Sequence, residues 1–234
     1  MSASKLATAL KSIPWDENVT TFLSDPSAGE LCAACSLRLA IWAKQFEIAD
    51  RENPSLAFVR QMQVSGHHVA ATAALAIYAS AAAAMRSVFD SALYYSYFRS
   101  HLTELSTLAR DRDYYVNKND ILDFHKTHTV GFVERQASCK VLSDIADWYK
   151  DISSLIHGQI PGAWNDHKSM SDIKHRAETL NLVMQKWTKT VDIVHMFFLC
   201  TVAQDLWHDF APESKRKLLF GISGATKEAL KLDL

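Results

Sequence analysis

Apolar residues recur every three or four positions along most of the chain, the spacing that places them on one face of a helix. The clearest stretch ends near residue 158, and its apolar positions are Ile145, Trp148, Ile152, Leu155 and Ile156. Gly158 can end a helix in the left-handed conformation, and Pro161 disfavours a restart nearby. We therefore predict a helix over residues 131–157.

The same periodicity predicts other long helices over residues 30–50, 66–98 and 172–208. Shorter helices are predicted over residues 4–12, 56–64, 102–110, 120–128, 213–220 and 224–231. Most of the N-terminal segment, residues 1–28, is expected to be irregular because turn-forming residues are frequent between Trp15 and Ser27. Residues 158–171 form the clearest predicted loop.

No linker, repeat or low-complexity tract divides the chain, so we predict one domain over residues 1–234. Seven Gly and five Pro in 234 residues are too few for the many turns of an all-β fold. The predicted fold class is therefore all-α: one bundle of four to five main helices, with short helices over residues 211–234.

The net charge and the positions of the cysteines limit which ligands and which cellular compartment are expected. The formal net charge of −1 gives no strong basic field for tight, sequence-independent binding of long nucleic acids. The only compact basic cluster, Lys215 to Lys217, is typical of a solvated helix face. Cys32, Cys35, Cys139 and Cys200 lie in apolar helical patterns, as expected of buried thiols in a reducing cytoplasm.

The twenty residues from Gly66 to Met85 carry no charge and are long enough to cross a membrane. They are dominated by Ala, Ser and Thr, which gain little in lipid but allow helices to approach closely. We therefore predict a buried helix there and no membrane partner. The first residues also lack the layout of a signal peptide.

A polar column accompanies the apolar stripe of the 131–157 helix. Tyr149, Ser153 and His157 follow one another at four-residue steps, and Lys150 flanks them. His157 lies in the last turn, where the helix dipole favours a charged imidazole. On another predicted helix, Arg86 and Asp90 are four residues apart and should meet on one face.

Three kinds of site can be built from these residues. A metal site would use His125 and His128 with Asp123, but the paired Glu-x-x-His motifs of di-metal bundles are missing, so neither metal nor cofactor is expected. A partner-binding surface would use aromatic side chains, namely Trp148, Trp164 and Trp207.

The third site is one for phosphodiester chemistry. His157 would act as general acid–base, and Lys150 and Arg86 would stabilise developing charge. Tyr149 and Ser153 would position phosphate oxygens, and Asp90 is the third residue assigned to substrate binding. The alternative is structural, with His157 capping the helix and bonding a backbone carbonyl.

Two segments together resemble prokaryotic HEPN-type helical domains, over about residues 80–160. They are Arg86-Ser-Val-Phe-Asp90-Ser-Ala-Leu-Tyr-Tyr-Ser-Tyr-Phe-Arg99-Ser-His101 and Tyr149-Lys-Asp-Ile-Ser153-Ser-Leu-Ile-His157-Gly158. The resemblance implies a helical bundle, often paired, from toxin–antitoxin, abortive-infection or other defence systems. Active members are metal-independent ribonucleases in which an Arg precedes a His by a few residues, and two such motifs face each other across a dimer.

This chain departs from that motif, because no Arg stands at the required distance before His157 and Lys150 is the nearest substitute. Lysine lacks the bidentate fork that grips phosphate. The one literal match, Arg60 to His67, crosses Gly66 at an expected helix break. We therefore predict a HEPN-like defence or stress protein, an RNA-cleaving homodimer or a subunit with a protein partner. The alternative is a non-catalytic bundle serving as an interaction subunit.

Overall fold

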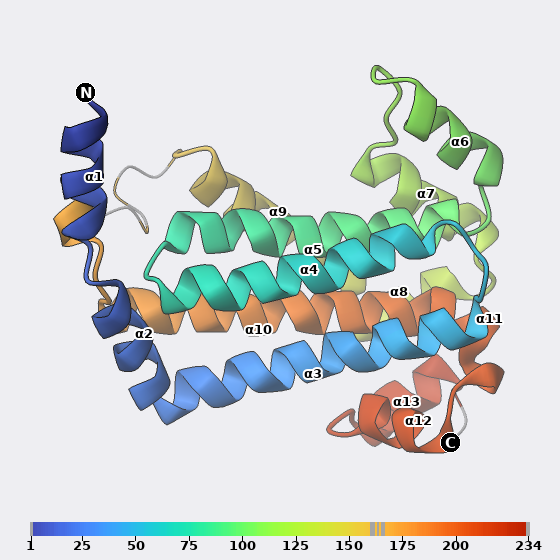
Figure 1. Cartoon of the computed structure of the whole chain (residues 1–234). Coiled ribbons are helices and arrows are strands. Elements are labelled where there is room, and N and C mark those ends of the chain that lie inside the picture. Colours follow the sequence, from blue (N-terminus) through green and yellow to red (C-terminus); the bar gives the residue numbers. More distant parts are fainter. Residues whose placement is uncertain (1, 160–161, 163, 165–166, 233–234) are drawn as a thin grey trace.

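The computed structural model describes residues 2–159, 162, 164 and 167–232, and all regular structure in these residues is helical. The predicted all-α class is confirmed. Five helices exceed fifteen residues: α3 (Pro26–Ala49), α4 (Leu56–Ala74), α5 (Tyr78–Phe98), α9 (Val141–Ile156) and α10 (Ala177–Cys200). In Figure 1 they run side by side; α4 packs on α3 and α5, and α10 packs on α3, α5 and α9.

Shorter helices gather at the ends of these long ones. The α-helices are α1 (Ala3–Lys11), α2 (Trp15–Ser24), α6 (Leu102–Arg110), α7 (Lys118–His128), α8 (Phe132–Cys139), α11 (Val202–Leu206), α12 (Pro212–Leu219) and α13 (Gly224–Leu230). Two 3₁₀ turns cover Met170–Asp172 and Trp207–Asp209. Helices α1 and α2 lie at one end of the long helices, and α6 and α7 lie at the other (Figure 1).

The prediction that most of the segment 1–28 is irregular was wrong, although the short helix predicted over residues 4–12 is present as α1. Helix α2 begins directly after Pro14, and α3 begins at Pro26 rather than near Glu30. The Asp25 side chain accepts hydrogen bonds from the backbone N–H groups of Ser27 (3.0 Å) and Ala28 (3.3 Å). An aspartate cap followed by proline in the first turn is a helix-start signal, so the residues taken for turns begin a helix.

The predicted 66–98 helix is two helices that fold back on each other. Helix α4 continues through Gly66 and ends at Ala74, and α5 begins at Tyr78. Ala76 takes the left-handed conformation (φ 59°), and the Ile77 N–H donates to the Thr72 carbonyl at 2.8 Å. The uncharged run therefore turns in its middle. In the described residues no helix has both the length and the apolar character that crossing a membrane requires.

Two other long predicted helices are also divided. Lys140, in the left-handed conformation (φ 57°), separates α8 from α9, and Thr201 separates α10 from α11. Neither residue is a typical helix terminator, so the apolar periodicity on both sides concealed the breaks. The helix predicted over residues 120–128 is α7, which begins two residues before the predicted start, at Lys118. Asn117 and Asp120 form its capping box.

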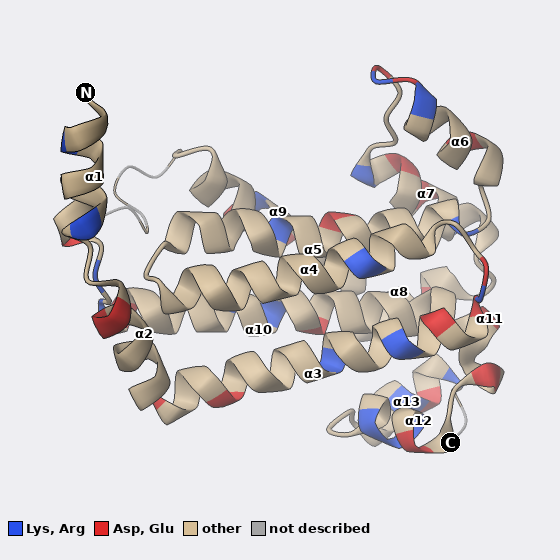
Figure 2. Cartoon of the chain, in the orientation of Figure 1, with Lys and Arg blue, Asp and Glu red and all other residues tan. Residues whose placement is uncertain are grey.

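Buried apolar side chains form one cluster that runs from Phe22 to Leu230. The Trp148 indole N–H donates to Thr190 Oγ1 at 3.0 Å, and Trp148 and Trp207 are only 2% and 6% exposed. The predicted aromatic partner surface is therefore wrong for these two residues. Cys32 and Cys35 are buried, which raises their thiol pKa values to about 11 and about 12. Charged residues of both signs are interspersed over the helices in Figure 2.

Candidate functional site

The sequence-predicted polar residues meet between α5 and α9. From α5, the Arg86 Nε atom pairs with Asp90 Oδ2 at 2.8 Å. Across the interface, the Arg86 guanidinium donates to Ser153 Oγ at 3.0 Å and to the Tyr149 hydroxyl. We call Arg86, Asp90, Tyr149 and Ser153 the α5–α9 polar cluster. Four of the six residues predicted to form the site are therefore in contact.

A fifth member of the site comes from a helix that the sequence did not connect with it. Lys118, in the first turn of α7, places its ammonium 4.7 Å from the centroid of the Tyr149 ring. The Arg86 Cζ atom lies 3.7 Å from the same centroid. Both distances are typical of cation–π contacts. No local spacing reveals Lys118, because its position depends on how α7 packs against α5.

Among the described residues, the site holds two cations, Arg86 and Lys118, and one carboxylate, Asp90. Burial raises the pKa of Asp90, while the charges of Arg86 and Lys118 act to lower it. Burial also lowers the pKa of Lys118, and the like charge of Arg86 lowers it further. The Arg86 and Asp90 side chains are 24% and 38% exposed, so solvent reaches the pair. An excess of positive charge at a partly exposed site favours an anionic ligand.

His157 and Lys150 stay outside the cluster. His157 is the C-cap of α9, and its backbone N–H donates to the Ser153 carbonyl at 2.9 Å. Its side chain is exposed and bonds no described residue, so the backbone-carbonyl bond of the structural alternative is missing there. Gly158 takes the left-handed conformation (φ 63°) as predicted, whereas Pro161 lies outside the described residues. Lys150 is exposed and makes no ion pair with the described residues.

The other Arg–His pair proves to lie on one continuous helix. Because α4 runs through Gly66, Arg60 and His67 are two turns apart along the same helix, contrary to the expected break. Arg60 Nε is 3.6 Å from Glu47 Oε1, and both side chains are largely exposed. Arg60 and His67 are therefore the alternative Arg–His arrangement for a nuclease site.

Asp123, His125 and His128, the residues considered for a metal site, do not form one. Asp123 pairs with Lys126 at 2.8 Å, and the buried His125 ring lies between Ser96 and Thr129. Among the described residues, no group of three or more His, Cys, Asp or Glu side chains is placed to hold a metal ion.

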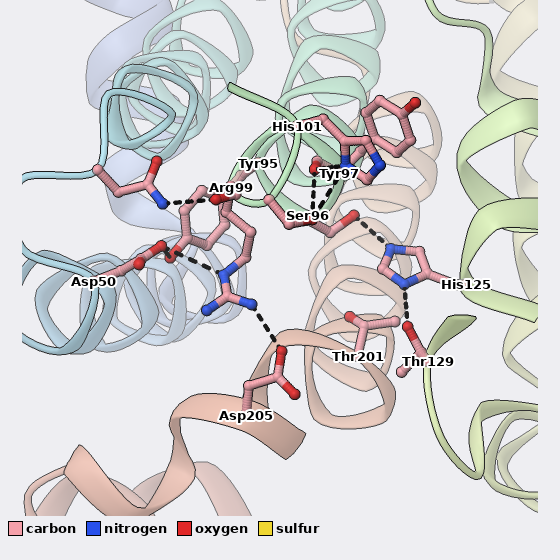
Figure 3. Close-up of polar contacts among 12 residues, drawn as sticks. Asp50, Tyr95, Ser96, Tyr97, Arg99, His101, His125, Thr129, Thr201 and Asp205 are labelled. Atoms are coloured by element: carbon pink, nitrogen blue, oxygen red, sulfur yellow. Dashed lines mark hydrogen bonds and ion pairs between the residues drawn. The ribbon is translucent and has the colours of Figure 1, made fainter. Parts of the chain in front are cut away.

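A second polar region, which the sequence did not suggest, lies where α5, α7 and α11 meet. Figure 3 shows Arg99 between Asp50 and Asp205, and His125 between Ser96 and Thr129. All of these residues except Asp50 border a cavity of about 400 Å³, which we call the α5–α11 cavity. Its members come from segments more than a hundred residues apart, so no sequence spacing could have indicated it.

His125 lines this cavity as a neutral imidazole and is not a catalytic base. Burial lowers its pKa to about 3. The Ser96 hydroxyl donates to the Leu93 carbonyl at 2.7 Å, so the proton between His125 Nε2 and Ser96 Oγ (2.9 Å) belongs to the ring. Nδ1 then accepts from the Thr129 hydroxyl at 2.8 Å. A serine whose hydroxyl donates elsewhere is not activated as a nucleophile.

Comparison of the chain with protein-family models, with curated proteins and with solved structures found no match. The HEPN resemblance stays a prediction made from the two sequence segments.

Proposed function

We propose that this chain is a HEPN-like helical protein of a prokaryotic defence or stress system that binds RNA at the α5–α9 polar cluster. We further propose that it cleaves the bound strand without a metal, with His157 as general acid–base. One observation carries the proposal. Arg86 and Lys118 share the Tyr149 ring, Asp90 is the one carboxylate of the described residues that pairs with Arg86, and the exposed imidazole is one helical turn beyond Ser153.

The chemistry uses each side chain in one role. An imidazole removes the proton from the ribose 2′-hydroxyl, the 2′-oxygen attacks phosphorus, and the bond from phosphorus to the 5′-oxygen breaks. A proton delivered to that 5′-oxygen completes the step, leaving a cyclic phosphate and a 5′-hydroxyl. Arg86 and Lys118 stabilise the charge of the transition state. Lys118 thereby takes the role that the sequence gave to Lys150.

The resemblance implies a paired arrangement, so the second acid–base group would come from a second copy of the chain. Ser153 and Tyr149 contribute hydroxyl groups within reach of Arg86, and they would hold phosphate oxygens next to it. This assignment predicts a homodimer with RNA as its ligand.

The test compares RNA cleavage by the parent protein and by His157→Ala in the presence of a chelator. We expect the variant to lose activity by about 10²- to 10⁴-fold, the usual contribution of a general acid–base group. Its melting temperature should stay unchanged, because the ring is exposed and bonds no described residue. His208→Ala is the matched control, since His208 is also exposed but belongs to the 3₁₀ turn Trp207–Asp209.

A third variant separates the two Arg–His arrangements. If His67→Ala loses cleavage and His157→Ala keeps it, the catalytic pair is on α4 and the present assignment is wrong. Cleavage that persists in both variants, or a parent protein without any cleavage, would also reject the proposed mechanism.

One observation favours a second function, that of a non-catalytic interaction subunit. The Arg86 guanidinium already bonds Asp90, Ser153 and Tyr149, as expected of a residue that fastens α5 to α9. Under this function the parent protein does not cleave RNA, and Arg86→Met lowers the melting temperature and complex formation together. Under the nuclease function, Lys118→Ala weakens RNA binding without such a loss of stability.

A further inference from the structure

The α5–α11 cavity lies around the end of α5 farthest from α1 and is independent of the proposed nuclease site. Its volume of about 400 Å³ is within the range of small-molecule pockets. Polar side chains make up much of its lining: Ser96, Arg99, Ser100, His125, His128 and Arg135. Phe124 and Val130 add apolar surface. The cavity therefore has the size and mixed lining of a ligand site.

Arg135, on α8, is the unusual member of this lining. It is only 8% exposed, and its guanidinium donates to the carbonyl oxygens of Val130 (2.7 Å) and Cys200 (3.1 Å). Its Nε atom has no hydrogen-bond partner, and the guanidinium forms no ion pair with any described residue. Burial lowers the pKa of Arg135. A buried cation without a counter-charge is costly, and buried polar atoms without partners are rare.

The neighbouring charges do not compensate Arg135. Arg99 and Asp50 are 16% and 15% exposed and pair with each other at 3.4 Å. Asp205 pairs with Arg99 at 2.8 Å, and its side chain is 65% exposed, so water screens its charge. Glu134 and Asp205 are near enough to favour the charged form of Arg135, and Asp205 also lines the cavity, but neither forms an ion pair with Arg135. Within the described residues, the guanidinium of Arg135 is therefore a buried cation without a direct counter-ion.

The backbone holds that guanidinium in place. Gly131 takes the left-handed conformation (φ 68°), and a Cβ atom there would lie 2.7 Å from one terminal nitrogen of Arg135. The other terminal nitrogen of the same group donates both carbonyl bonds. Because the donor is ordered before any ligand arrives, little side-chain entropy is lost on binding.

We propose that the α5–α11 cavity binds a small molecule that carries an oxyanion, with the anionic group on Arg135. The planar guanidinium matches the oxygen geometry of both phosphate and carboxylate. The rim residue His128 is exposed and stands one helical turn from Phe124, whose ring lies 5.2 Å from the imidazole, so the two would contact the rest of the ligand.

The experiment titrates the 234-residue chain with inorganic phosphate and with citrate by calorimetry, each against sodium chloride at matched ionic strength. We expect saturable binding of at least one oxyanion and none of chloride. The higher affinity of the two tells whether the natural group is a phosphate or a carboxylate.

Variants test whether the binding occurs in this cavity. Arg135→Met should abolish it. Because that change removes two buried hydrogen bonds and could prevent folding, His128→Glu provides a second test by placing a negative charge at the exposed rim. We expect His128→Glu to weaken binding by about tenfold or more. Thr127→Glu is the matched control, since it adds the same charge on α7 outside the lining and should leave the affinity unchanged.

Two results would overturn the proposal. One is the lack of saturable binding for both oxyanions. The other is an equal oxyanion affinity in His128→Glu and Thr127→Glu, which would show that the anion binds outside this cavity. Neither result depends on RNA cleavage, so the cavity and the nuclease site are tested separately.

Discussion

Helix α5 serves two polar regions that differ in how their arginines are satisfied. In the α5–α9 polar cluster, Arg86 bonds three side chains and is partly open to solvent. In the α5–α11 cavity, Arg135 is buried, bonds two main-chain carbonyls and keeps one nitrogen without a partner. The Arg86 guanidinium therefore has its hydrogen bonds within the chain, and the excess positive charge of the cluster comes from Lys118 beside it. In the cavity the buried guanidinium itself lacks a partner. The comparison indicates that an anion would add to a completed network at the cluster, whereas in the cavity it would supply a missing partner.

The largest expected effect concerns the histidines buried in the cavity wall and in the core. In the folded protein burial lowers the pKa of His125 and of His195 to about 3, well below the ordinary histidine value of about 6.5. As the pH falls from 7 to 5, both histidines become protonated in the unfolded chain but stay neutral in the folded protein. The free energy of unfolding therefore decreases. Each histidine should remove roughly 2 kcal/mol from the free energy of unfolding, which urea titrations at both pH values measure.

His125→Gln sharpens this test, because it removes the cavity histidine and leaves His195 in the core. The difference in unfolding free energy between pH 7 and pH 5 should fall by about half in the variant. An equal pH dependence in parent and variant would show that His125 is not held neutral by the fold.

The next largest effect is expected at two glycines in the left-handed conformation. One is near the α5–α9 polar cluster and the other is beside the α5–α11 cavity. Gly158 (φ 63°) ends α9 with open space around its Cα, whereas Gly131 (φ 68°) faces Arg135. Gly158→Ala should cost about 1 kcal/mol, the usual penalty for a left-handed alanine. Gly131→Ala should cost about 2–3 kcal/mol, because the guanidinium must also give up bonds to move away. Urea unfolding measures both, and equal costs would show that Arg135 is not held in place.

The smallest effect tests the cluster by the salt dependence of binding. If Lys118 contacts an RNA phosphate, Lys118→Ala should reduce the slope of log affinity against log salt concentration by about 0.7. Affinity at low salt should fall only several-fold. Fluorescence anisotropy with labelled single-stranded RNA measures this slope, and Lys227→Ala, on α13, provides the control. A slope identical to that of the parent would remove Lys118 from the RNA site.

Sequence periodicity predicted the helical class and the main part of the cluster. The four-residue spacing of Tyr149 and Ser153 fixed one face of α9, and the spacing of Arg86 and Asp90 fixed one face of α5. These relations hold within single helices, where position along the chain determines direction. The two faces then met because the apolar stripe beside Tyr149, including Trp148 and Ile152, is buried against the core.

Features set by tertiary packing could not be predicted in the same way. Ala76 and Lys140 adopt left-handed conformations that their residue types disfavour, so the surrounding structure imposes the breaks there. Lys118 reaches the Tyr149 ring only through the packing of α7 on α5. The cap at Asp25 is different, because its aspartate–proline signal was present in the sequence and was misinterpreted as a turn.

The spacing of Arg86 and Arg99 has a consequence for how the two regions could act together. They are thirteen positions apart, which on α5 corresponds to roughly 20 Å along the axis and about 140° around it. Helix α7 also joins the two regions, because it carries Lys118 at the cluster and His125 at the cavity. A tilt or a rotation of α5 or of α7 would therefore reach both regions at once.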